Sequence, residues 1–117
     1  MTFADPTFAH RTYYNAVEVL FWEFRRFQDK TPVNLASATQ IVLELRDPSG
    51  VNITPIVASS SAPGADWPNG IVAISLGPVV TAFVGTWSAS LTVFLAGEEI
   101  PRVGTIEVFD RPGVFTL

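Results

Sequence analysis

The sequence predicts an all-β fold, an antiparallel two-sheet immunoglobulin-like sandwich of about seven strands with an extended N-terminal arm. Apolar and polar residues alternate along several short segments, and turn signals separate these segments about every ten residues. The chain has 117 residues, the usual size of one domain, and no cysteine that could form a disulfide. We expect an arm over residues 1–15, the sandwich over residues 16–110 and a C-terminal tail over residues 111–117.

The chain is poor in charge. Charged residues make up 15% of it, against roughly 25% in average globular proteins, and the net charge is −4. A domain with so little surface charge is expected to have part of its surface covered by neighbours. The basic residues are spread along the chain, which argues against nucleic acid as a partner.

A stretch without charged residues runs from residue 71 to residue 97 and is long enough to cross a membrane. Gly77, Pro78 and Gly85 interrupt it, and Thr or Ser recurs at every second position after Gly85. We therefore predict strands here and no membrane contact. The N-terminus lacks a basic segment followed by an apolar block, so we expect no secretory leader.

Residues 1–15 have neither the period of a helix nor that of a strand. Their aromatic side chains either fold back on the domain or lie on another subunit, because leaving them in water forfeits about 1.5–3 kcal/mol each. Residues 16–28 are rich in β-branched and aromatic side chains and predict a long strand with apolar groups on both faces. The helical spacing of Leu20, Phe24 and Phe27 keeps a helix as the rival interpretation.

Residues 40–46 alternate as a half-buried strand does, and Asp47-Pro48-Ser49-Gly50 then gives the strongest turn signal in the chain. The return strand over residues 51–58 is weakened by Pro55, which predicts an edge strand. Residues 59–69 form a loop by composition, residues 70–76 the next strand, and residues 79–84 a short connector.

Residues 86–95 predict the central strand of the domain. Trp87, Ala89, Leu91 and Val93 alternate with hydroxyl residues, so one face points to a core and Trp87 is its main aromatic residue. Residues 96–99 are predicted as a turn, and residues 103–109 as the returning strand, with Ile106 and Val108 inward.

Candidate catalytic residues are few. His10 is the single histidine and lies on the arm, where a solvated side chain is expected. Glu98 and Glu99 fall in a predicted turn, and no spacing matches a catalytic triad, a calcium loop or a phosphate loop. The sequence therefore predicts no enzyme, no catalytic residue, no metal ligand and no cofactor.

Aromatic side chains are the remaining candidates for ligand binding. Trp67, in the loop, is the candidate ligand residue, because a flat exposed ring on a β-sandwich can stack on a sugar; Trp22 and Phe109 could also face outward. The favoured alternative is that Trp67 plugs the end of the sandwich or a subunit contact. Arg25 and Arg26 either pair with acidic residues of a neighbour or lie on a solvated face.

Three segments carry a resemblance to a known family. Residues 31–38 read Thr-Pro-Val-Asn-Leu-Ala-Ser-Ala, residues 41–50 Ile-Val-Leu-Glu-Leu-Arg-Asp-Pro-Ser-Gly, and residues 85–93 Gly-Thr-Trp-Ser-Ala-Ser-Leu-Thr-Val. With these segments the chain resembles small immunoglobulin-like virion proteins of tailed bacteriophages, in particular the N-terminal domain of the baseplate upper protein family, over residues 17–108. Asn34 stands where that family usually has Asp. The chain also stops after the domain, which favours a decoration subunit over an adaptor to a fibre.

The resemblance implies a non-enzymatic structural protein of the virion, assembled in the host cytoplasm as a decoration or adaptor subunit on capsid, tail or baseplate. Its partners are then other virion proteins and copies of itself, and we expect deletion of residues 1–15 to leave the sandwich folded but to abolish incorporation into particles. The expected contact residues are Phe3, Phe8, Tyr13, Tyr14, Val114, Phe115 and Leu117. The alternative is a carbohydrate-binding module that uses Trp67 on a surface glycan. An enzyme would need His10 beside a carboxylate in a cleft.

Overall fold

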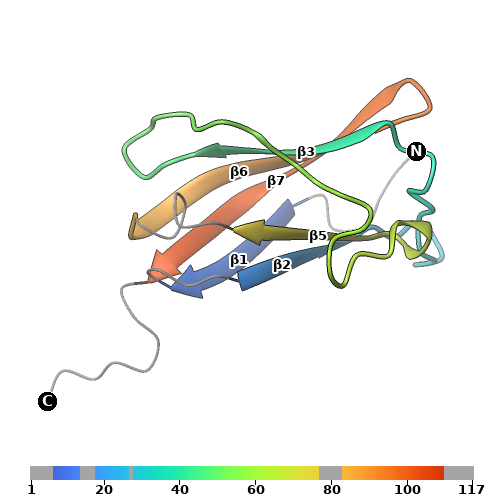
Figure 1. The fold of residues 1–117 in the computed structure, drawn as a ribbon, viewed down its shortest axis with the longest axis horizontal. Helices are drawn as coiled ribbons and strands as arrows, with labels where there is room; N and C mark the ends of the chain where they lie inside the picture. The colour runs from blue at the N-terminus through green and yellow to red at the C-terminus, as the bar shows by residue number, and fades with distance from the viewer. Residues whose placement is uncertain (1–6, 14–17, 27, 77–82, 110–117) are drawn as a thin grey trace, which may run out of the picture.

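The computed structural model describes residues 7–13, 18–26, 28–76 and 83–109, and Figure 1 shows their arrangement. These residues form seven strands and one short 3-10 helix. The elements are β1 (Thr7–Tyr13), β2 (Glu18–Glu23), β3 (Gln40–Arg46), β4 (Ile56–Val57), η1 (Trp67–Asn69), β5 (Ile71–Leu76), β6 (Gly85–Leu95) and β7 (Glu98–Phe109). In this part of the chain, no helix has the length and apolar character that a membrane crossing requires.

The strands form two sheets that enclose one core. The larger sheet has five strands in the order β1-β7-β6-β3-β4, and the smaller sheet pairs β2 with β5. Buried apolar side chains from both sheets make up a single cluster, so the core lies between the sheets. The predicted two-sheet β-sandwich is confirmed.

β6 occupies the centre of the larger sheet, between β3 and β7. Its odd-numbered residues from Trp87 to Leu95 are buried, while the even-numbered residues are exposed or half-exposed. Trp87 has 0% of its surface exposed, and its indole Nε1 donates a hydrogen bond to the Phe83 carbonyl at 3.1 Å. The predicted central strand and its core tryptophan are therefore confirmed.

The turn after β3 is held by one carboxylate. Asp47 Oδ1 accepts hydrogen bonds from the Ser49 hydroxyl at 2.7 Å, and from the amides of Ser49 and Val51 at 2.9 Å each. These bonds, that of the Ser49 hydroxyl first, hold the pKa of Asp47 below its usual value. The return strand is shorter than predicted: β4 has two residues after Pro55 and lies at the edge of the sheet.

The β6–β7 hairpin turns earlier than predicted. Ala96 and Gly97 have φ of 53° and 77°, as in a two-residue primed turn whose twist matches the strands. Glu98 and Glu99 therefore already pair with β6, and β7 is five residues longer than the segment 103–109. This extension brings Arg102 into the sheet, with its side chain on the core side.

The predicted arm is wrong for residues 7–13, which form a strand. β1 pairs with β7 along its whole length, from Thr7↔Val103 to Tyr13↔Phe109, and the two strands run parallel. This is the one parallel pairing among the described strands, so the prediction of a wholly antiparallel sandwich also needs this correction. Gly104 permits the pairing, because a Cβ there would lie 2.0 Å from the Phe8 carbonyl oxygen.

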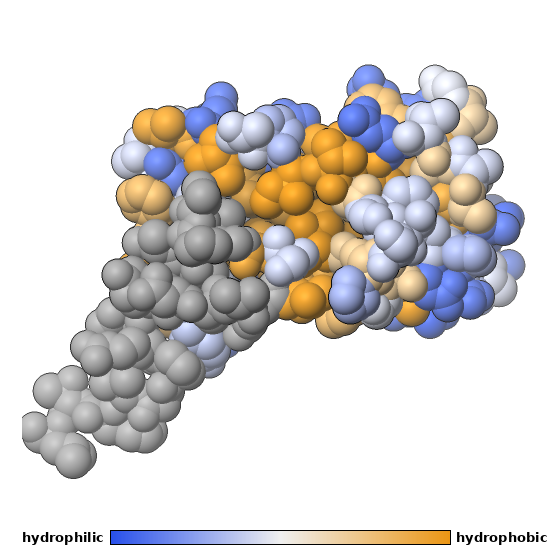
Figure 2. Space-filling model, in the orientation of Figure 1, coloured by the Kyte–Doolittle hydropathy of each residue, from blue (hydrophilic) through white to orange (hydrophobic). Residues whose placement is uncertain are grey.

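β2 covers the core with one face only. Leu20, Trp22 and Phe24 are buried, while Val19 and Phe21 on the other face are 36% and 49% exposed. The apolar groups predicted on both faces are present, and those on the outer face are partly exposed in this chain. Figure 2 shows that apolar side chains reach the surface across the middle of this view.

Candidate functional site

A pocket of about 280 Å³ lies between the edges of β1 and β2. We call it the β1–β2 pocket. β1, β2 and β7 supply most of its lining; Phe8, His10, Trp22 and Arg102 face the gap between the sheets, while Phe21 and Glu23, on the other face of β2, form its outer rim. The lining residues are Phe8, His10, Phe21, Trp22, Glu23, Arg25 and Arg102.

Three rings form one wall of the pocket. The His10 ring stands edge-on to Trp22 with centroids 4.8 Å apart, and the Phe8 ring stands edge-on to Trp22 at 5.5 Å. Such tilted contacts are the favoured geometry for aromatic pairs. The rings therefore attach β1 to the opposite sheet as well as to β7.

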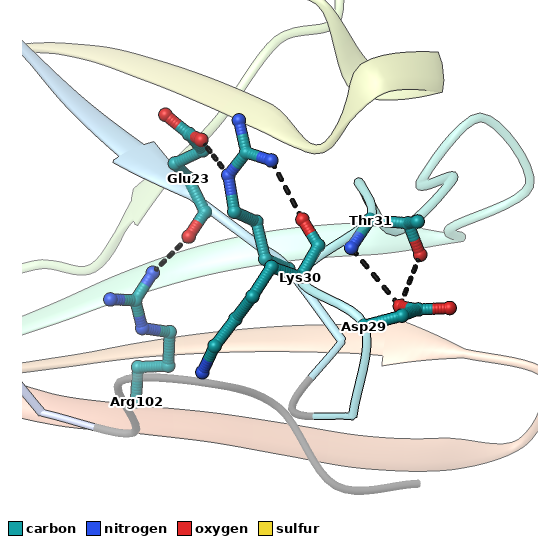
Figure 3. A network of polar contacts seen from close by, with 6 residues as sticks. Glu23, Asp29, Lys30, Thr31 and Arg102 are labelled. Carbon is teal, nitrogen blue, oxygen red and sulfur yellow. Dashed lines mark hydrogen bonds and ion pairs between the residues drawn. The ribbon is translucent and has the colours of Figure 1, made fainter.

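Arg102, on β7, lines the same pocket as these rings and is 6% exposed. Its Nη1 donates a hydrogen bond to the Glu23 carbonyl at 2.9 Å, and its guanidinium carbon lies 4.9 Å from the centre of the Phe24 ring. Figure 3 shows Arg102 reaching the backbone of β2 from β7. The cation thus ties the two sheets together.

The Glu23 carboxylate points away from this contact and pairs with the Arg25 guanidinium (Figure 3). Arg25 Nη1 also donates to the Lys30 carbonyl at 2.7 Å, and Asp29 Oδ1 accepts from the amide and hydroxyl of Thr31. Arg25 therefore holds the turn after β2 with a partner in its own segment. The prediction that it pairs with a neighbouring protein has no support from this geometry.

His10 is not the solvated side chain that the sequence predicts. Burial, followed by the charge of Arg102, lowers the pKa of His10 below its usual value. The buried Nε2 of His10 has no hydrogen-bond partner among the described residues, and the same holds for Thr12 Oγ1 and Trp22 Nε1. The pocket therefore favours neutral His10.

We predict that acid loosens β1. The charged groups facing His10 are Arg102 on β7 and the Glu23–Arg25 pair beside β2. Because the pKa of His10 in the folded state lies below 6.5, the unfolded chain binds this proton more tightly. The contribution of His10 to the free energy of unfolding is therefore constant above pH 6.5 and falls below it. Urea unfolding between about pH 8 and about pH 5 measures this fall. His10→Gln should remove most of the dependence; an unchanged slope in that variant would contradict the assignment.

The pocket brings His10 and Glu23 together, which is the condition the sequence set for an enzyme. No hydrogen bond joins them among the described residues, because the Glu23 carboxylate is occupied by Arg25. Histidine and carboxylate therefore do not form an acid–base pair here. In the described part of the chain, no three His, Cys, Asp or Glu side chains are grouped to hold a metal ion.

A second, open groove of about 590 Å³ lies on the outer face of the larger sheet. Small side chains from β6, Ser88 and Ser90, form its floor, and Glu44, Arg46 and Val103 line it. The Arg46 guanidinium is held by Asn52 at 3.1 Å. This groove has a mixed polar and apolar lining, which contains no aromatic residue.

One end of the sandwich presents aromatic and apolar side chains to solvent. Phe83 is 52% exposed, Val84 49% and Phe109 38%, and the Tyr13 ring lies 6.0 Å from that of Phe109. They lie together because Gly85 pairs with Val108, and Tyr13 with Phe109. We call these four residues the end cluster; β6 starts there, and β1 and β7 finish there (Figure 1).

The predicted contact residues have different outcomes. Phe8 turns inward against Trp22 of its own chain, whereas Tyr13 belongs to the end cluster; their contact with another subunit stays a prediction. The other predicted contact residues lie outside the described part of the chain: Phe3, Tyr14, Val114, Phe115 and Leu117. The same holds for residues 79–82 of the predicted connector and for the tail at 111–117.

Trp67 is not an exposed sugar platform. It opens the 3-10 helix η1, is 8% exposed and belongs to the core, and its carbonyl accepts the Leu35 amide at 2.7 Å. This burial agrees with the favoured alternative, that Trp67 plugs the sandwich. Trp22 and Trp87 are also buried, so none of the three tryptophans presents a flat face to a ligand.

The two-sheet arrangement can be compared with solved structures. The N-terminal domain of phage TP901-1 ORF48 matches with a TM-score of 0.52 and 14% sequence identity, over 89% of this chain and 83% of that chain. The chain shares the fold of a phage protein domain. The phage-related fold implied by the sequence resemblance is therefore confirmed. No protein-family model matches the sequence, and no curated protein matches it.

Arg102 is the pocket residue that sequence reasoning missed. It shares its parity with Ile100, Ile106 and Val108, all buried on β7, so alternation alone could have placed it inward. The predicted strand missed this signal, because it began at residue 103, one residue after Arg102. The hydrogen bond from its side chain to β2 joins residues far apart in the sequence, so alternation along one strand could not predict it.

Proposed function

We propose that this chain is a non-enzymatic structural subunit of a tailed-phage particle, a decoration or adaptor subunit on baseplate, tail or capsid. One observation carries the proposal: the fold is shared with the N-terminal domain of phage TP901-1 ORF48 over 89% of this chain. Because fold alone does not fix function, the surface must supply the rest of the argument.

The surface supports attachment to other proteins. The end cluster exposes two phenylalanines and a valine at one end of the sandwich, and such apolar groups on a soluble domain commonly mark a protein contact. Only 15% of the residues are charged, which suits a subunit whose surface is partly covered. We propose that the end cluster is the surface by which this chain attaches to a neighbouring particle protein, and we call it the seat.

The pocket chemistry supports the non-enzymatic part of the proposal. The surroundings of His10 favour its neutral form, and Glu23, the one carboxylate among the described residues that line the pocket, is engaged by Arg25. A general acid or base needs an accessible group with a pKa matched to its task. The three tryptophans are buried, so Trp67 does not offer a sugar platform; Phe109 does face outward, as part of the end cluster.

Incorporation into particles tests the proposed seat. We expect the double variant Phe83→Ser, Phe109→Ser to fold but to be lost from gradient-purified particles of the phage that encodes the chain. The matched control is Val57→Ser, Val103→Ser, since these valines are 57% and 53% exposed but lie outside the end cluster. Equal incorporation of both variants would rule out the end cluster as the seat. Thermal melting of each purified variant separates lost attachment from lost folding.

A further inference from the structure

We propose that β1 is an exchangeable strand, and that β1 of one copy takes the place beside β7 of a second copy, reciprocally. The partner is therefore a second copy of this chain. This inference deepens the proposed function and rests on it for its setting, since particle subunits are held close to one another. Reciprocal exchange of an element is a low-cost route to a symmetric contact.

The place that β1 occupies is shaped for this particular strand. Gly104 leaves room where any larger residue would collide, since a Cβ there would lie 2.0 Å from the Phe8 carbonyl oxygen and 2.8 Å from Phe8 Cγ. Trp22 then contacts both the Phe8 and the His10 ring. A β1 strand from a second copy carries the same residues and fits without any change to the site.

β1 is held less firmly than the other long strands. The side chains of β1 that face the core are Phe8, His10 and Thr12, so two of the three are polar. His10 Nε2 and Thr12 Oγ1 are buried without a hydrogen-bond partner among the described residues, which favours the released strand because water can then bind both. Opening of β1 should therefore need less free energy than unfolding of the core.

The connectivity permits exchange. β1 is the last strand of the five-stranded sheet, so its release breaks no pairing except that with β7. Only residues 14–17 separate Tyr13 from Glu18, where the chain passes from one sheet to the other. The connection is therefore short in sequence, and short connections favour exchange between identical copies.

Single cysteines can detect exchange, because the chain has none of its own. Ala9 and Thr105 are register partners on β1 and β7, and both face the outer side. The double variant Ala9→Cys, Thr105→Cys should form an intrachain disulfide, which confirms the geometry. Full-length chains carrying Ala9→Cys alone and Thr105→Cys alone are then mixed at high concentration, incubated under reducing conditions, and oxidised.

We expect an interchain 9–105 disulfide in the mixture, identified by peptide mass, whose yield grows with incubation time and concentration. The control replaces Thr105→Cys by Val103→Cys, which lies on the same face but is out of register with Ala9. The 9–105 link should exceed the 9–103 link several-fold. Equal yields would show random collision and overturn the proposal, as would a 9–105 link that forms only within the double variant. Either failure leaves particle incorporation, and so the proposed function, to be judged separately.

Discussion

Replacement of Trp87 by alanine is expected to lower the free energy of unfolding by about 3–5 kcal/mol, the usual cost of truncating a buried aromatic residue. Trp87 has no exposed surface, lies on the central strand and bonds Phe83 through its indole nitrogen. The free energy of unfolding of a small domain is about 5–15 kcal/mol in total, so the variant should be only marginally stable at body temperature. Urea denaturation followed by circular dichroism gives the value.

Two further variants make this measurement specific. Thr86→Ala changes an exposed neighbour on the same strand and should alter stability by less than about 0.5 kcal/mol. Trp87→Phe keeps an aromatic ring in the core and should fall between the two. A loss below about 1 kcal/mol for Trp87→Ala would show that this residue does not fill the core as described.

Gly104→Val should displace β1 from β7. The added Cβ would collide with the Phe8 backbone, and a backbone strand cannot yield as the end of a flexible side chain can. We expect stability to fall by about 3 kcal/mol and the amides of residues 7–13 to lose protection from hydrogen exchange, while those of β3 and β6 keep it. Hydrogen exchange with mass spectrometry resolves these segments.

The control for Gly104→Val is Ser88→Val, which places the same side chain on the exposed outer face of β6. This variant should leave protection of β1 unchanged. If β1 also stayed protected in Gly104→Val, the parallel register of β1 and β7 would be wrong. The result would also bear on deletion of residues 1–15, which removes β1: the larger sheet should then lose its edge strand while β3, β6 and β7 stay paired.

Strands β3 and β6 of the larger sheet could be predicted, because each shows a single buried face. β3 spans Gln40 to Arg46, as the alternation of Ile41, Leu43 and Leu45 indicated. β6 follows the same rule around Trp87. Local alternation is sufficient where one side of a strand meets the core and the other meets water.

β1 could not be predicted in this way, because polar His10 and Thr12 interrupt its inward row. Its partner, β7, lies about a hundred residues later in the chain, and the room for the pairing comes from Gly104 on that partner. The burial of Trp67 has a similar cause. A plug was the favoured interpretation of Trp67, but its packing partners could not be predicted, because the fold brings Leu35 and the core to it.

The central claim, that this chain is a structural part of a phage particle, is tested most directly by its copy number in purified particles. Quantitative mass spectrometry of gradient-purified particles should find the chain at a fixed ratio to the other structural proteins, unchanged after a high-salt wash. If the chain stayed in the unassembled fraction and was absent from the particles, the account of its function would be wrong.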